Sequence, residues 1–230
     1  MNSKFLKAVV TAGLSGLVLG GCASPQGQAV PDGVREAAER GDANAQYRLA
    51  LASDFGRGVP RDPAEAAKWY RKAADQGNAE AQNSLGSMYQ HGQGVPVDYD
   101  NALSWYQKAA AQGHAEATAN IGALYDFGLG VAKDERKAVD HYQAAAEKGS
   151  VTAMLNLGVS YWRGEGVQKD LVQAYKWLDL GRFYTQTSPN QQLKWRIRGV
   201  LESVEKEASQ AQITEGKRLA RSWDALNRPK

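Results

Sequence analysis

The chain has 230 residues, of which 28 are basic and 25 acidic, so its formal net charge is +3, and it contains a single cysteine. This near balance, without a basic stripe, argues against nucleic-acid binding, and one cysteine excludes an intramolecular disulfide. Stability must therefore come from packing alone, and the chain is long enough for one well-packed domain.

Residues 1–21 have the pattern of a bacterial export signal. Lys4 and Lys7 precede an apolar stretch that is too short to span a membrane comfortably. The stretch ends in Leu-Gly-Gly-Cys, which resembles the lipobox of bacterial lipoproteins. The resemblance implies cleavage before Cys22 and lipidation of that cysteine, and Ala23 after it favours the outer membrane. The alternative is an ordinary export signal with an unmodified thiol.

Residues 22–33 lack periodicity and contain proline and glycine, so we expect a flexible tether. From residue 34 onward the sequence repeats with a period of 36. Residues 34–41 carry Ala37 and Ala38 at the phase of an Ala-Ala pair one period later. They therefore predict a lone helix that caps the first complete repeat.

Four copies of Gly-x-Gly-Val mark the period most clearly, and a fixed spacing in this range indicates stacked supersecondary units. The copies occupy residues 56–59, 92–95, 128–131 and 164–167. We divide the repeats at about 42–77, 78–113, 114–149 and 150–181.

Each repeat predicts two helices joined by the glycine loop. In the second repeat, Ala81, Leu85 and Tyr89 share one face of a first helix, helix A. Trp105 and Tyr106 lie on a second helix, helix B, with alanines at the same helical spacing. The loop supplies the positive-φ backbone that ends helix A, and the aspartate after it caps helix B.

These columns resemble the Sel1-like repeat, a relative of the tetratricopeptide repeat, from residue 34 to residue 181. The resemblance implies an all-α fold, a right-handed α-solenoid of helix–loop–helix repeats with capping helices at both ends. The departures are Ala50 and Ser53 in the first repeat and His141 in the third, where the pattern has Gly, Tyr and Trp.

The resemblance also implies a partner-binding groove lined by residues 2, 5, 9 and 12 of each helix A. Transferred by register, these positions are Asn44, Tyr47, Leu51 and Asp54, then Glu80, Asn83, Ser87 and Gln90, then Glu116, Ala119, Ala123 and Asp126, and finally Thr152, Leu155, Val159 and Trp162. Such a surface suits an extended or helical peptide.

Residues 182–230 follow the last repeat and predict two helices that cap the open end of the stack. Their apolar residues at helical spacing are Leu193, Ile197, Val200, Leu201, Val204 and Ala208, then Leu219, Trp223 and Leu226. This segment has 10 basic and 5 acidic residues, so it could face anionic lipid or an acidic partner. A solvated helix surface is the simpler interpretation.

Catalytic and metal-binding patterns are weak. His91, His114 and His141 occupy different phases of the repeat and show no i, i+4 pairing, so we predict no metal site. Helix capping explains the recurring aspartates, and the glycine loops lack the full nucleotide-binding pattern. We predict neither a catalytic residue nor a cofactor.

The favoured function is a non-catalytic scaffold or assembly factor that binds an envelope protein or peptide segment, anchored by its lipid at the periplasmic face. One alternative is an accessory lipoprotein of a secretion or exopolysaccharide export machine, with a glycan or a pore subunit as its ligand. A surface-exposed host-binding protein is another. An envelope hydrolase would need a polar cluster that the sequence does not show.

Overall fold

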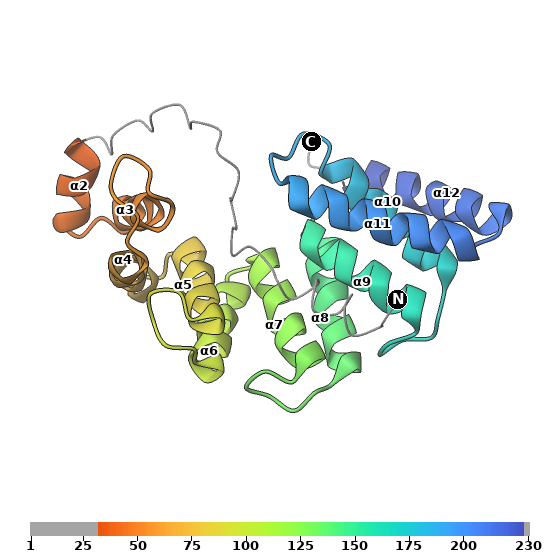
Figure 1. Cartoon of the computed structure of the whole chain (residues 1–230), viewed down its shortest axis with the longest axis horizontal. Coiled ribbons are helices and arrows are strands. Elements are labelled where there is room, and N and C mark those ends of the chain that lie inside the picture. The colour runs from red at the N-terminus through yellow and green to blue at the C-terminus, as the bar shows by residue number, and fades with distance from the viewer. Residues whose placement is uncertain (1–31, 228–230) are drawn as a thin grey trace. The chain divides into compact units, whose positions relative to one another are not determined.

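The structure is a computed structural model that describes residues 32–227. The described residues form helices and no strand, which confirms the all-α prediction. The predicted signal peptide, Cys22 and the tether up to residue 31 lie outside the described residues. The helices, labelled in Figure 1 where there is room, are α2 (Asp32–Glu39), α3 (Ala43–Phe55), α4 (Pro63–Asp75), α5 (Ala79–His91), α6 (Tyr99–Ala111), α7 (Ala115–Phe127), α8 (Glu135–Glu147), α9 (Val151–Arg163), α10 (Leu171–Tyr184), α11 (Gln191–Glu207) and α12 (Gln210–Asn227).

The chain divides into two compact units between Ala117 and Thr118, inside α7. In the first unit, α3 and α5 are A helices, and α2, α4 and α6 are B helices. In the second, α7 and α9 are A helices, and α8 and α10 are B helices. Helix α3 packs on α2 and α4, and α9 packs on α8 and α10. Each of these A helices therefore lies between two B helices, as expected for a solenoid of helix–loop–helix repeats.

The helix ends are formed by side chains that the repeat places there. Asp42, Asn78 and Ser150 each accept a hydrogen bond from the backbone N–H three residues later. Asp62, Asp98, Asp134 and Asp170 cap the four B helices of the repeats in the same way. At the start of α7, the Ala117 N–H donates to His114 Nδ1 at 3.1 Å. This histidine therefore acts as an N-cap acceptor.

The two glycines of each Gly-x-Gly-Val loop have different roles. Gly56 and Gly92 end their A helices in the left-handed conformation, each with φ of 68°. A Cβ on Gly94 would lie 2.1 Å from the Pro63 carbonyl oxygen. A Cβ on Gly166 would lie equally close to the backbone of α8. The second glycine thus lets each of these loops rest on the first turn of the preceding helix B.

Glycines on helix A make room for large side chains of helix B. A Cβ on Gly86 would lie 2.7 Å from the ring of Tyr106, and a Cβ on Gly122 would lie 2.8 Å from the ring of Tyr142. Both tyrosines are fully buried. The two helices of a repeat therefore approach closely, and the tyrosine ring fills the contact.

Buried glutamines join three successive helices in the first unit. Gln82 Nε2 donates to the Ala74 carbonyl at 3.0 Å, and its Oε1 accepts from Gln112 Nε2 at 2.8 Å. Gln46 and Gln76 form the corresponding pair one repeat earlier. Because a buried amide without a partner is costly, each satisfied glutamine helps to set the position of α3 or α5 against its two neighbours.

Tryptophans on the B helices belong to the core. Trp69 and Trp105 are at most 9% exposed, and Trp177 is 1% exposed. Lys72 Nζ lies 3.8 Å from the ring centroid of Trp69, and Lys108 Nζ lies 3.7 Å from that of Trp105. Both lysine nitrogens therefore lie over the indole rings and make cation–π contacts.

The N-terminal helix begins earlier than predicted. Helix α2 starts at Asp32, so the last two residues of the predicted tether are helical. Val34 and Ala38 are buried and belong to the core cluster of the first repeat.

Helix α12 covers α10, the B helix of the last repeat. A Cβ on Gly216 would lie 2.9 Å from Tyr175 Cβ, so α12 crosses α10 at close range. The Trp223 ring lies 5.7 Å from that of Trp177 in an edge-on contact. Leu226, predicted to share this apolar stripe, is instead 86% exposed because it lies in the final turn of α12, beyond the contact with α10.

The different roles of the two glycines predict different costs of substitution. Gly56→Ala places a side chain at positive φ, with its Cβ 3.3 Å from Arg61 Cβ, and should destabilise the protein by about 1 kcal/mol. Gly94→Ala adds a clash with the backbone of α4 and should cost about 3 kcal/mol or more. Denaturant unfolding of both variants measures the difference, and equal costs would contradict the proposed contact.

His141, which replaces tryptophan in the third repeat, predicts acid sensitivity. Its ring stacks on Tyr125 with centroids 5.7 Å apart, and burial lowers its pKa below the ordinary 6.5, with Asp140 opposing. The folded state therefore binds this proton less readily than the unfolded chain, so the stability present above about pH 6.5 is lost as the pH falls. Melting temperatures between about pH 7 and pH 5 should fall less steeply in His141→Trp. Parallel pH curves would refute this prediction.

Candidate functional site

The groove face is the side of each A helix that carries residues 2, 5, 9 and 12, which are predicted to line the groove. In the first unit this face belongs to α3 and α5. The side chains at its four positions differ in how many contacts they make with other helices of the same chain.

Position 2 takes part in stacking one repeat on the next. Asn44 Oδ1 accepts from Asn78 Nδ2 at 3.0 Å, and Glu80 Oε2 accepts from His114 Nε2 at the same distance. In both pairs, the partner is the N-cap of the following A helix. Asn44 and Glu80 are exposed, but they also hold neighbouring A helices in register.

Position 12 meets the buried tyrosine of helix B. The Tyr106 hydroxyl donates to Gln90 Oε1 at 2.7 Å. In the first repeat, Tyr70 is hydrogen-bonded to Asp54, and burial raises the pKa of Asp54 against the opposing effects of Arg61 and that hydrogen bond. In the third repeat Asp126 lies near Tyr142, but the buried Tyr142 hydroxyl has no hydrogen-bond partner among the described residues. In the first two repeats, position 12 is therefore an acceptor for the repeat's own tyrosine.

Positions 5 and 9 carry partly exposed side chains in the first unit. Tyr47 and Leu51 on α3 are partly exposed, and the Tyr47 ring lies 5.9 Å from that of Tyr70. Asn83 and Ser87 take the same positions on α5 and are also partly exposed. The first repeat therefore offers an aromatic and an aliphatic side chain where the second offers polar groups.

The second unit departs from the predicted groove. Leu155 is fully buried and Val159 is 7% exposed, so the prediction that Leu155 contacts a partner is wrong. Ala119, at position 5 of α7, is also buried. In the fourth repeat, Leu155 and Val159 are buried because helix α11 covers them. The sequence predicted this helix only as a cap on the end of the stack.

Helix α11 covers the groove face of the fourth repeat. Its Ile197, Val200, Leu201 and Val204 form one apolar cluster with Leu155 and Val159 of α9. At position 12, the Trp162 indole N–H donates to Glu207 Oε1 at 2.8 Å, and Lys169 Nζ lies 2.7 Å from the other carboxylate oxygen.

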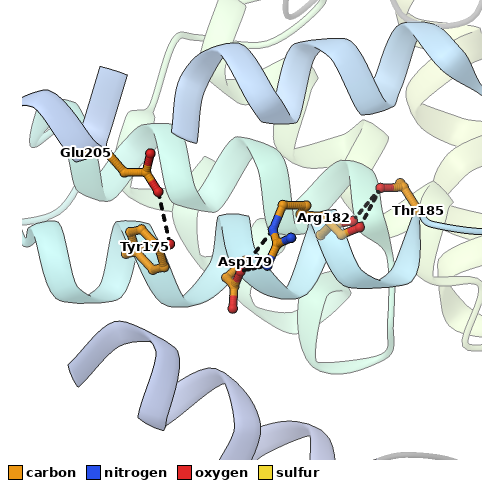
Figure 2. Close-up of polar contacts among 6 residues, drawn as sticks. Tyr175, Asp179, Arg182, Thr185 and Glu205 are labelled. Carbon is orange, nitrogen blue, oxygen red and sulfur yellow. Dashed lines mark hydrogen bonds and ion pairs between the residues drawn. The ribbon is translucent and has the colours of Figure 1, made fainter. Parts of the chain in front are cut away.

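A second attachment joins α11 to α10. The Tyr175 hydroxyl donates to Glu205 at 3.1 Å, as Figure 2 shows. Figure 2 also shows Thr185 at the end of α10, where its hydroxyl donates to the Arg182 carbonyl at 3.0 Å. Thr152 remains partly exposed at position 2 of the same repeat, as does Glu116 on α7.

The signal for this arrangement was present in the sequence. Leu155 and Val159 form an apolar pair at positions where the second repeat has Asn83 and Ser87. An apolar pair at the last repeat, followed by an amphipathic helix, indicates that the chain covers its own surface.

The part of the chain that the structure describes contains neither a metal-binding cluster nor a membrane-spanning helix. Within residues 32–227, no group of three or more His, Cys, Asp or Glu side chains is arranged to hold a metal ion. No helix in the described part of the chain combines the length and the apolar character of a membrane span.

Comparison with known proteins gives the family. Residues 43–78, 79–114, 115–150 and 151–181 match the Sel1 repeat. A Sel1 repeat protein from Oxalobacter formigenes is 33% identical over 86% of this chain and 75% of its own, with a TM-score of 0.69. The chain belongs to the Sel1 repeat family, whose members generally mediate protein–protein interactions.

Other solved structures are more distant. A protective antigen present in uropathogenic Escherichia coli strains is 30% identical over 84% of this chain and 48% of its own, with a TM-score of 0.46. An immunity protein from Pseudomonas aeruginosa is 21% identical over 88% and 81%, with a TM-score of 0.51, and shares the fold alone. Among curated proteins, none matches the chain.

Proposed function

We propose that this protein is a non-catalytic scaffold or assembly factor that binds a helical or extended segment of an envelope protein on the groove face of its A helices. A lipid on Cys22 would hold it in the bacterial envelope, at the periplasmic face of the outer membrane. The pattern of residues 1–22 supports the anchor, and membership of the Sel1 repeat family supports protein binding.

One observation carries the assignment of the groove face. Helix α11 lies on positions 5, 9 and 12 of the fourth repeat, with an apolar stripe against Leu155 and Val159 and a carboxylate on Trp162. The chain thus contains an example of a helix on this surface. The same positions of the first unit, Tyr47 and Leu51 among them, stay partly exposed.

The remaining polar groups on this face have structural partners, which favours binding over catalysis. Asn44 and Glu80 join A helices, and Gln90 accepts from a buried tyrosine. A partner segment would therefore meet a preformed surface, whose side chains lose little freedom on binding.

Crosslinking in cells tests the binding surface. A photo-crosslinking residue at Asn83 on α5 should capture a defined envelope protein, because this position lies on the groove face. The control is the same residue at Gln107, which is exposed on helix B. Mass spectrometry identifies the products. If Asn83 gives no product, or the same products as Gln107, the groove face is not the binding site.

A serine at Cys22 tests the anchor. Cys22→Ser should lose incorporation of a palmitate analogue and move from the membrane to the soluble envelope fraction, since no acyl chain can then form on the thiol. A Ser24→Ala variant is the matched control. Unchanged labelling of Cys22→Ser would exclude lipidation at this residue.

A further inference from the structure

We propose that the groove face of the first repeat selects a partner segment carrying a lysine or arginine, which binds Asp54 while apolar residues of the segment pack on Tyr47 and Leu51. This inference rests on the proposed function and names the chemistry of the partner.

The three side chains form one surface. Tyr47, Leu51 and Asp54 are spaced by four and three residues, so they share one side of α3. All three are partly exposed, and the core cluster of the first repeat supports Tyr47 and Leu51 from beneath. The second repeat has Asn83, Ser87 and Gln90 at these positions. It therefore has neither a carboxylate nor an apolar side chain there.

The carboxylate of Asp54 is incompletely compensated. Arg61 is the cation that acts on it, but the Arg61 Nε donates to the Asp54 backbone carbonyl at 2.9 Å. Burial outweighs both Arg61 and the hydrogen bond with Tyr70, so the pKa of Asp54 is raised. Glu80 adds a second negative charge near Tyr47. A cation from a partner would therefore stabilise a partly desolvated charge.

In the fourth repeat, the donor and acceptor roles at position 12 are the reverse of those in the first repeat. There, position 12 is a donor, Trp162, Lys169 lies beside it, and the helix on that face presents an acceptor, Glu207. In the first repeat, position 12 is an acceptor, and Arg61, which takes the place of Lys169 in the repeat, is offset by Asp54. An occupant of the first repeat should therefore present a cation where α11 presents Glu207.

Two synthetic peptides test the inference on the full chain. One has the sequence of residues 191–207, and the other differs only by Glu207→Lys. Binding of each is measured by fluorescence anisotropy to the wild-type protein, to Asp54→Gln and to Asp75→Asn. Asp54→Gln should preserve the fold, because Gln90 already accepts from Tyr106 in the same position of the second repeat. Asp75→Asn removes an exposed charge from helix B.

The lysine peptide should bind wild-type protein about tenfold more tightly than the native-sequence peptide. The difference should disappear in Asp54→Gln and persist in Asp75→Asn, with unchanged melting temperatures. Equal binding of the two peptides, no binding of either, or a preference that survives Asp54→Gln would overturn the inference. None of these results decides the scaffold function, which the Asn83 crosslink tests separately.

Discussion

The contact between a bulky side chain of helix B and a glycine of helix A is the constraint on which these repeats depend. Gly86 and Gly122 admit the rings of Tyr106 and Tyr142 at distances that a Cβ would prevent. A tyrosine buried in this way needs an acceptor for its hydroxyl, and in the second repeat Gln90, at position 12 of helix A, accepts from Tyr106. The packing of the core therefore decides part of the chemistry of the groove face.

Stacking of one repeat on the next uses a second part of that face. Asn44 and Glu80 bind the N-caps of the following A helices, while Gly94 and Gln82 hold the loop and α5 against α4. Positions 2 and 12 are thus tied to architecture. Positions 5 and 9 are left to vary between repeats, and in the first unit they differ between apolar and polar side chains. Selection of a partner can use these side chains together with the charge of Asp54 at position 12 of the first repeat.

A stack of amphipathic repeats ends with faces that no further repeat covers. The last repeat solves this with two helices, because α12 packs on α10 through Gly216 and Trp223, and α11 packs on α9 through an apolar stripe. The same contact that completes the core also removes Leu155 from the surface. The example of α11 shows what kind of segment this face accepts when its residues are apolar.

The repeat period alone determined the stack of two-helix units and the caps at Asp62 and its equivalents, because each follows from local spacing within about 36 residues. The resemblance to the Sel1-like repeat, applied through the period, also assigned residues to the groove face. Only the tertiary structure decided which of them remain accessible. Whether Leu155 is exposed depends on a helix some 40 residues later in the chain, and whether Asn44 is already bonded depends on the next repeat. Such contacts join residues far apart in sequence, so no local pattern encodes them.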